Sequence, residues 1–521
     1  MTSPPSMAEL VPPVTVAEIE LEEPVSVTHM SVAVPGDGGR TPQALVLVRL
    51  HSVPVGTVIV DAPEGKVNAA SCAEAAWTSL EALLTAHLDA DGLPATSPVG
   101  PRIDTALPQC QQGSLGAEAP HISVVVATRE RSRSLASCLD SLARLDYTNY
   151  EVVVVDNDPV TDATASLVSG RNELNLRYVV EHRRGLAAAH NCGLEQAKGT
   201  VVAFTDDDVI VDQRWLTEVA RAFRSDTNVA CVTGLIMPGE LKTHAQLKLE
   251  THADNGKGFT PRVFDCGTHR PADPLFPFTV GQLGSGANMS FSKDILLEIG
   301  GFDPATGVGT VSRGGDELAA FFSVLTAGYA LVYQPNALIW HYHRRDLASL
   351  SNQVYGYGVG LGAYLTSVLV THPEVIGQAL RQLPAGLRYA FHLASQRNPR
   401  VGDAWPRQLA WRERRGIAFG PLAYGVSRWR SRGARRPNSV GQRSQSGLPQ
   451  KKRRTATGIS TGRPPIAASA RRRCHSTWHR QSEWLAPVWR RPAARPSGRP
   501  DQPRPGHHPS HGPTPPGTRH R

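Results

Sequence analysis

Short apolar runs alternate with helical periodicities along the middle of the chain, from about residue 121 onward. ISVVVAT, YEVVVVDND, LRYVVEH and TVVAFTDDD each predict a buried strand, because parallel strands covered on both faces carry near-continuous apolar runs. Between them lie helical segments such as SRSLASCLDSLARL, in which Leu135, Leu139 and Leu142 recur at i, i+4 and i+7. This alternation predicts an α/β fold with a mostly parallel sheet flanked by helices.

Polar residues follow three of the predicted strands at the point where each strand ends. They are Thr128-Arg129-Glu130, Asp156-Asn157-Asp158 and Asp206-Asp207-Asp208. In open α/β sheets, ligands bind in the crevice beyond the carboxyl ends of the strands. One crevice is therefore expected to use all three groups.

Residues 1–118 have a different pattern and predict a small N-terminal α+β unit. Residues 43–61 are expected to form two strands around a Pro/Gly turn, and residues 71–88 an amphipathic helix. A linker rich in Pro, Gly and Gln follows at 92–116. No catalytic constellation is visible in this unit.

The expected domain boundaries after the N-terminal unit are 119–375 for the α/β domain, 376–430 for a helical extension and 431–521 for a disordered tail. The tail is rich in Arg, Pro, Gly, Ser and His, and such a composition cannot bury enough apolar surface to offset chain entropy. It contains 20 Lys and Arg against two acids, whereas the whole chain has a net charge of +9. The rest of the chain is thus net negative, and no nucleic-acid partner is expected for it.

The seven cysteines are scattered singly, so neither a disulfide framework nor a structural zinc site is expected. The N-terminus lacks a basic start followed by an apolar run, so no signal peptide is expected. The longest apolar stretch, at 359–370, is too short to span a bilayer, and a buried helix is favoured there over an interfacial one. These features favour a cytoplasmic protein.

The three adjacent acids at 206–208 are open to three interpretations. They can form a solvated turn with helix-capping acids, for which Asp212 is well placed. They can begin a phosphatase nucleophile loop, although Ile210 stands where that family usually has Thr. They can also hold a divalent cation, Mn²⁺ or Mg²⁺, through Asp206 and Asp208, because carboxylates and substrate phosphates are the usual ligands of these ions.

A longer set of motifs resembles family 2 of the inverting glycosyltransferases, whose fold is called GT-A. The motifs are VVVATRERSRSLASCLDSL, YEVVVVDNDPVTDAT, RRGLAAAHNCGLEQAKGTVVAFTDDDVIVDQRWL, GSGANMSFSKDILLEIGGFD and GGDELAAFFSVLTAGYALVYQPNALIWHYHR. They occur in the family's order over roughly residues 121–357. The resemblance implies a nucleotide-diphosphate sugar donor, a divalent cation, and a glycan, lipid-linked or small-molecule acceptor. A cell-envelope glycan is the family-level expectation.

The resemblance also implies roles for individual residues. The expected donor-binding positions are Thr128, Arg129, Glu130, Asp156, Asp158, Arg184, Asn191, Asp206 and Asn288. The expected metal ligands are Asp206, Asp208 and His341. His343 is a weaker candidate, because the two histidines would point to opposite faces if the strand continued through them.

The family usually supplies its catalytic base from a Glu-Asp pair at the head of a helix, and here the acids are swapped as Asp316-Glu317. Glu317 stands at the position of the base and Asp316 is the alternative. Helix capping is the competing explanation for both, since acids favour a helix N-terminus.

The expected function is metal-dependent glycosyl transfer with inversion, in the cytoplasm or at the inner face of the membrane, where Lys/Arg clusters are attracted to anionic lipid. One alternative is a catalytically idle protein that binds sugar nucleotides, with the swapped acids as the mark of lost chemistry. Another is nucleic-acid binding through the tail, which lacks a recognised module.

Overall fold

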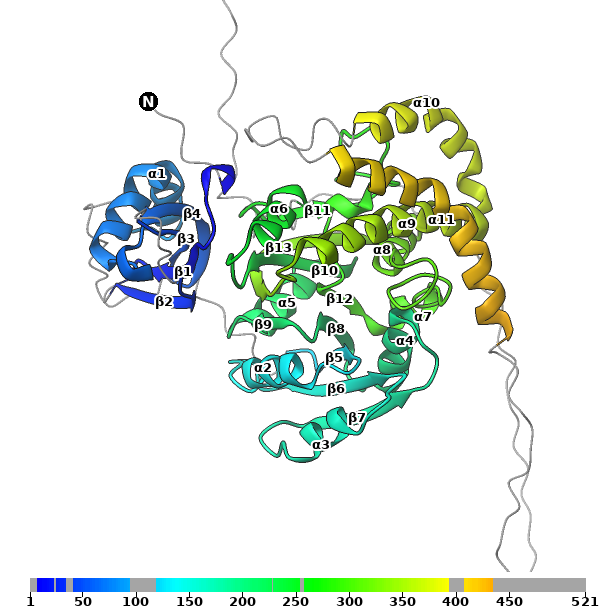
Figure 1. Cartoon of the computed structure of the whole chain (residues 1–521), viewed down its shortest axis with the longest axis horizontal. Coiled ribbons are helices and arrows are strands. Elements are labelled where there is room, and N and C mark those ends of the chain that lie inside the picture. The colour runs from blue at the N-terminus through cyan, green and yellow to red at the C-terminus, as the bar shows by residue number, and fades with distance from the viewer. Residues whose placement is uncertain are drawn as a thin grey trace, which may run out of the picture. The chain divides into compact units, whose positions relative to one another are not determined.

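The computed structural model describes residues 7–22, 25–33, 41–93, 119–226, 228–253, 257–392 and 407–433 (Figure 1). The predicted linker lies almost wholly outside these residues, and so does the tail predicted to be disordered from Ser431 onward. Four short 3₁₀ helices occur in the described part of the chain, at Met7–Glu9, Pro63–Gly65, Val280–Gln282 and Pro373–Val375.

The N-terminal unit is a four-stranded sheet with one helix on it, in the strand order β2-β1-β3-β4. Its elements are β1 (Thr15–Glu20), β2 (Ser26–Ser31), β3 (Gln43–Leu50), β4 (Val53–Asp61) and α1 (Ala69–Ala90). The predicted hairpin is present, but the expected Pro/Gly turn is wrong. Pro54 and Gly56 lie inside β4, and the turn is made by His51 and Ser52, both with positive φ.

Strand β3 is buried on both faces, which explains its continuous apolar run. Val46 and Val48 pack toward α1, whereas Leu45 and Leu47 pack in a cluster with Leu235, Met237, Leu338 and Trp340 of the α/β domain. Beside this cluster, the buried guanidinium of Arg49 contacts Glu18 at 2.8 Å and Asp212 at 2.5 Å. Asp212 also accepts a hydrogen bond from the Arg214 backbone N–H at 2.9 Å.

The α/β domain is built on a sheet with the order β11-β13-β10-β12-β8-β5-β6-β7, and β9 pairs with β13. The strands are β5 (Ile122–Thr128), β6 (Tyr150–Asn157), β7 (Leu176–Glu181), β8 (Val201–Asp206), β9 (Val209–Val211), β10 (Val229–Pro238), β11 (Arg262–Phe264), β12 (Asn288–Ser292) and β13 (Ala330–His341). The strands β7, β6, β5 and β8 run parallel, as predicted. Antiparallel β12 is inserted between β8 and β10, which the apolar pattern did not indicate.

Helices cover both faces of this sheet, as predicted. The domain's helices are α2 (Ser132–Leu142), α3 (Ala163–Ser169), α4 (Leu186–Gln196), α5 (Trp215–Arg224), α6 (His244–Ala253), α7 (Lys293–Glu298) and α8 (Asp316–Thr326). Alternate residues of β5 divide the core: Val124 and Val126 pack with α2, α3 and α5, while Val125 packs with α4, α7 and α8. The predicted fold class is confirmed.

Three further helices follow the last strand: α9 (Leu347–Thr371), α10 (Ile376–His392) and α11 (Arg407–Gly433). Helices α9 and α11 lie side by side (Figure 1), and glycines allow the close approach, since a Cβ on Gly362 would lie 2.4 Å from the carbonyl oxygen of Ile417. By length and composition alone, α9 could cross a membrane, but half of its apolar window is buried inside the protein. The expected helical extension therefore begins earlier, with a long helix that packs on the domain.

Candidate active site

Strand register brings the three predicted polar groups to one edge of the sheet. Thr128 pairs with Asp156 on the neighbouring parallel strand, and Ala127 pairs with Asp206 on the other side. The carboxyl ends of β5, β6 and β8 therefore lie side by side. Their polar side chains are therefore grouped at this edge of the sheet.

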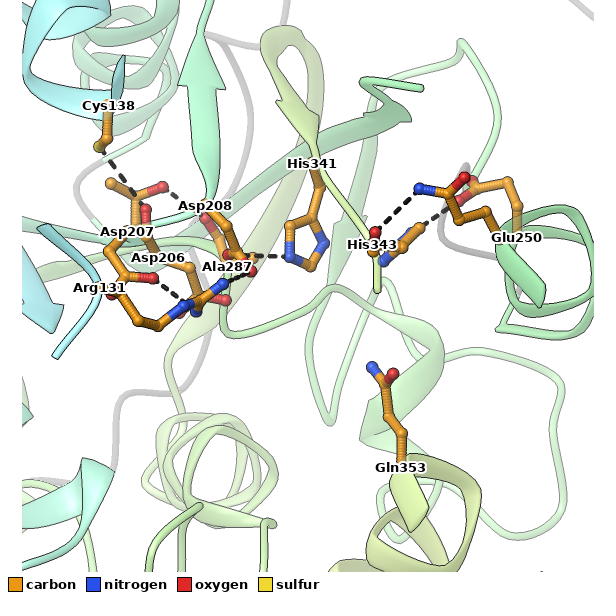
Figure 2. Close-up of polar contacts among 12 residues, drawn as sticks. Arg131, Cys138, Asp206, Asp207, Asp208, Glu250, Ala287, His341, His343 and Gln353 are labelled. Atoms are coloured by element: carbon orange, nitrogen blue, oxygen red, sulfur yellow. Dashed lines mark hydrogen bonds and ion pairs between the residues drawn. The ribbon is translucent and has the colours of Figure 1, made fainter. Parts of the chain in front are cut away.

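Two of the three adjacent acids, Asp207 and Asp208, share Arg131, and each has one further partner (Figure 2). Asp207 is buried, accepts a hydrogen bond from the Thr128 hydroxyl at 2.6 Å and contacts Arg131 at 2.6 Å. Asp208 contacts Arg131 through Oδ2 at 2.6 Å and the His341 ring Nε2 through Oδ1 at 3.2 Å. The mutual repulsion of the acids is thus offset by one guanidinium and one imidazole.

His341 reaches the acids because β9 pairs with the end of β13. His341 lies opposite Val209, the residue after Asp208, and the Tyr342 backbone N–H donates to the Asp208 carbonyl oxygen at 3.0 Å. One ligand atom each from Asp206, Asp208 and His341 lie within 4.8 Å of one another. Two carboxylates and an imidazole at this spacing form a donor set that suits a divalent cation.

The electrostatics of this group follow from burial and close charges. Burial, helped by the charge of Asp208, raises the pKa of Asp206. Burial also raises the pKa of Asp207 to about 7, against the opposing effect of Arg131 and Thr128. Burial alone would lower the pKa of His341, but its hydrogen bond to Asp208 and the charges of both neighbouring acids raise that pKa to about 9. The group thus retains excess negative charge in its ionised form, which favours a bound cation.

The pair Asp316-Glu317 stands at the start of α8, and its two side chains have different surroundings. Gly315 precedes the helix with a φ of +90°, and a Cβ there would lie 2.6 Å from the carbonyl oxygen of Gly360. Asp316 is buried with its Oδ2 at 3.3 Å from His190 Nδ1. Glu317 keeps partial solvent access and lies against Gly286, at which an added Cβ would be 3.6 Å from its own Cβ. Glu317 therefore keeps some solvent access, which Asp316 lacks.

Burial raises the pKa of Glu317 to about 8, with further contributions from the charges of Asp316 and Asp206. The charge of Asp206, a member of the acid cluster, thus acts on the Glu317 carboxyl. A carboxylate whose pKa lies near neutrality is suited to accept a proton and pass it on.

Asp156 is buried at the end of β6, and the Tyr178 hydroxyl donates to its Oδ2 at 2.8 Å. Burial raises the pKa of Asp156, and the hydrogen bond from Tyr178 opposes that rise. Nearby, Arg129 pairs with Asp158 at 3.1 Å in a partly exposed contact. Glu130 accepts hydrogen bonds from the backbone N–H groups of Val160 and Thr161 and so shapes the rim beside Asp156.

Residues 123–274 match the family model described as glycosyl transferase family 2. This segment is a glycosyltransferase family 2 domain. It contains the three strand ends and the acid cluster. The family match therefore covers the strand ends on which the expected resemblance was based.

Two relatives align with about half of the length of this chain. The succinoglycan biosynthesis protein ExoM of Rhizobium meliloti is 25% identical over 53% of this chain and 81% of its own. The pre-mycofactocin glycosyltransferase of Mycobacterium tuberculosis is 29% identical over 49% of this chain and 48% of its own. Matches to glycosyltransferases of Streptococcus pneumoniae and Bacillus subtilis span only 14% and 33% of those proteins.

Among solved structures, a mannosyltransferase of Pyrobaculum calidifontis in complex with GDP-Man and Mn²⁺ is similar with a TM-score of 0.37 and 19% identity. The match covers 61% of this chain and 80% of that one.

Two of the expected donor-binding residues of the family 2 domain hold the protein together. The Asn191 amide donates to the Phe302 carbonyl at 2.7 Å and accepts from the Phe302 backbone N–H at 2.9 Å, which fixes the turn after Gly301. Asn288 is buried, accepts from Trp215 Nε1 at 2.9 Å and donates to backbone carbonyls of β10 and β13. Both amides thus make hydrogen bonds within the protein, and their role in donor binding stays a prediction.

Two further predicted residues, Arg184 and His343, lie outside the acid cluster. Arg184 is exposed in the loop before α4. His343 pairs with buried Glu250 at 3.0 Å and has no contact with the acid cluster (Figure 2). The strand ends at His341, so the two rings do not point to opposite faces as expected; their centroids are 4.6 Å apart.

Three functional positions were missed. Arg131 neutralises two of the acids, Tyr178 binds Asp156, and Asn157 holds the loop after β7 by accepting from the Gly185 N–H at 2.9 Å. The run TRERSR offered a signal for Arg131, because a third residue after a strand end can still reach the crevice. Tyr178 lies within a predicted strand, and nothing in its sequence context distinguishes it from a core residue.

Proposed function

We propose that this chain transfers a sugar from a nucleotide-diphosphate donor to an acceptor hydroxyl with inversion at the anomeric carbon. The observation that carries the proposal is the grouping of Asp206, Asp208 and His341 within 4.8 Å, with Glu317 near enough for the charge of Asp206 to raise its pKa. The family match over residues 123–274 supports the reaction class.

Asp206, Asp208 and His341 would hold a divalent cation, Mn²⁺ or Mg²⁺. The fit rests on the donor set itself, which is two carboxylates and one imidazole. Asp208 is paired with Arg131 and His341, while burial and the charge of Asp208 raise the pKa of Asp206. When bound, the ion would neutralise charge on the departing nucleoside diphosphate. Arg131 is placed to contribute positive charge to the same group.

Glu317 is proposed as the general base. In a single displacement the acceptor oxygen forms a bond to the anomeric carbon while the bond from that carbon to the phosphate oxygen breaks. The hydroxyl proton goes to the Glu317 carboxylate, and the bonding electron pair leaves with the nucleoside diphosphate. The access of Glu317 to solvent and its raised pKa support this role, since a base must reach the hydroxyl and be basic enough to take the proton.

Asp316 is proposed as a positioning residue. It is buried against His190, whose ring packs on Phe204 and Phe302 at 5.0 Å. Its negative charge raises the pKa of the adjacent Glu317. The swapped order of the two acids is therefore compatible with catalysis, because the second position faces the crevice.

The nucleoside part of the donor is proposed to bind at the ends of β5 and β6. Buried Asp156 offers a carboxylate beside Thr128, and Arg129, Glu130 and Asp158 form the rim. A carboxylate held by one tyrosine hydroxyl retains capacity to accept from a ribose or base. The role of ExoM in succinoglycan biosynthesis supports a glycan as the class of acceptor.

We further propose that the protein contacts an anionic membrane through α11. Trp411, Leu422 and Trp429 share one face of this helix at spacings of about three and two turns, and they are 63%, 63% and 76% exposed. Exposed arginines, including Arg412, Arg415 and Arg430, flank that stripe. Aromatic and aliphatic side chains bordered by Arg are typical of helices that lie in a lipid interface.

Release of nucleoside diphosphate, followed in the presence of Mn²⁺ and an envelope-glycan extract, tests the proposal against the idle-binder alternative. A transferase releases the diphosphate and labels the acceptor. An idle protein binds the donor and releases nothing.

A further inference from the structure

The N-terminal unit contains a second cluster of metal-ligating side chains, formed by His51, His87 and Asp91. His51 Nδ1 lies 2.8 Å from Asp91 Oδ2, and His87 Nε2 lies 3.2 Å from the same oxygen. The two ring nitrogens are themselves 3.2 Å apart. Three donor atoms from three side chains thus form a compact triangle.

The fold brings these residues together from two elements. His87 and Asp91 are four residues apart at the end of α1, so both lie on one side of the helix. His51 occupies the turn between β3 and β4 with a φ of +55°, and Ser52 follows with +65°. Residues other than Gly, Asn and Asp are uncommon at such angles. The turn is held in place by Glu20, which accepts from the Ser52 backbone N–H at 2.8 Å.

The triangle has the size of one face of a zinc coordination sphere. With Zn–N and Zn–O distances of about 2.0–2.1 Å, tetrahedral ligands lie roughly 3.3 Å apart. Two of the observed separations are 3.2 Å, close to that value. The third, between His51 and Asp91, is shorter at 2.8 Å. Small side-chain movements would be enough to admit an ion.

Hydrogen bonds among His51 Nδ1, His87 Nε2 and Asp91 Oδ2 cannot all have good geometry at once. If both ring nitrogens carry protons toward the shared Asp91 oxygen, two N–H groups are forced to within 3.2 Å of each other. If one nitrogen is unprotonated, its contact with the carboxylate brings two lone pairs together. A cation at the centre uses all three lone pairs at once, and the side chains of His51 and Asp91 are 0% and 3% exposed, so water does little to relieve the conflict.

We propose that His51, His87 and Asp91 form a structural Zn²⁺ site. Two imidazoles and one carboxylate are a nitrogen-rich donor set, which favours Zn²⁺ over Mg²⁺ or Mn²⁺. The side chain of His87 is 15% exposed, so a water molecule can complete the coordination from that side. The ion would tie the β3–β4 turn to the end of α1, two residues from Arg49 and its contact with Asp212.

Isothermal titration of Zn²⁺ into the full untagged chain tests this site. The titration is done in an Asp208→Asn background, which removes a ligand of the proposed Mn²⁺ or Mg²⁺ site. The variants are His87→Ala and Asp91→Asn. The matched control is His269→Ala, because His269 and Asp265 form an exposed pair at 2.8 Å with the same i,i+4 spacing but no third ligand.

The site predicts one equivalent of Zn²⁺ that is lost in both variants and retained in the control. The loss of affinity should exceed the roughly 10–100-fold cost of removing an outer-shell partner. Zn²⁺ should also raise the midpoint of thermal unfolding in the parent and in the control but in neither variant. Circular dichroism of the zinc-free variants verifies that they fold.

Equal Zn²⁺ affinity in the parent and in both folded variants would overturn the proposal and leave a hydrogen-bonded His–Asp–His group. Absence of any Zn²⁺ binding to the parent would overturn it as well. Because the test needs neither donor nor turnover, failure here leaves the proposed transferase function untouched.

Discussion

Two clusters of histidine and aspartate occur in the described part of the chain, and they differ in composition and exposure. Asp206, Asp208 and His341 are rich in oxygen and lie at the edge of the large sheet. His51, His87 and Asp91 are rich in nitrogen, and two of their three side chains are almost wholly buried. The first cluster also has the guanidinium of Arg131 beside it.

The difference shows how the same residue types can form two kinds of metal site. An oxygen-rich group that remains accessible can share a cation with substrate phosphates, and this requires ligands left open on one side. A largely buried, nitrogen-rich group suits an ion that stabilises the fold. Position relative to the sheet decides between them, since ligands gather at the carboxyl ends of parallel strands.

The largest expected effect is on the first cluster. Asp208→Asn removes one charged ligand and the partner of His341, so transfer should fall on the order of 10³-fold, because charge on the leaving group is no longer neutralised. Turnover with and without added Mn²⁺ is the measurement. Zn²⁺ binding at the second cluster should be unchanged, and unchanged Mn²⁺ dependence of transfer would refute the assignment.

The next effect concerns the base. Glu317→Gln keeps size and hydrogen bonding but removes basicity, so turnover should fall roughly 10²-fold or more while donor affinity stays nearly constant. Asp316→Asn should cost less, since that side chain is buried against His190. Single-turnover kinetics with donor-binding titrations measure both. The reverse ranking would make Asp316 the base.

The pH dependence of turnover follows from the raised pKa of Glu317. Only the ionised carboxylate accepts a proton, so turnover should decline as the pH falls through the pKa of Glu317, which is about 8 when no cation is bound. A cation at the first cluster stabilises the carboxylate and moves the decline to lower pH. A kcat profile from pH 5 to 9 should show this acidic limb in the wild type, and its persistence in Glu317→Gln would assign it to another group.

The smallest effect concerns α11. Leu422→Ala removes three carbon atoms from the exposed stripe. At about 0.8 kcal/mol per buried CH₂, binding to phosphatidylglycerol vesicles should weaken by up to roughly 60-fold if all three enter the lipid. Leu297→Ala, at an exposed leucine of α7, is the matched control. Sedimentation with vesicles measures both variants. Equal losses, or none, would exclude α11 as the membrane surface.

The sequence was informative wherever a pattern repeats along the chain. The parallel strands and the polar residues at their ends follow from apolar runs, and the grouping of Thr128, Asp156 and Asp206 follows from register. The antiparallel insertion of β12 did not follow, because NMSFS is too short to indicate its direction.

Hydrogen bonds between side chains and residues distant in the sequence were the feature of the site that the sequence predicted least well. Asn191 and Asn288 stand at family positions, yet their amides are used by Phe302 and Trp215, far away in sequence. The turn at His51 was missed because Pro54 and Gly56 are stronger turn signals by residue type. Local propensity does not reveal that the turn must carry His51 to the end of α1.

The most direct test of the central claim is donor binding that depends on both Mn²⁺ and Asp208. Thermal unfolding of the wild type and Asp208→Asn is measured with a panel of nucleotide sugars, with and without Mn²⁺. A true donor at 100 times its Kd should stabilise the wild type by about 2.7 kcal/mol, but only with Mn²⁺, and should not stabilise the variant. Equal stabilisation of the variant, or none of the wild type by any nucleotide sugar, would contradict the account.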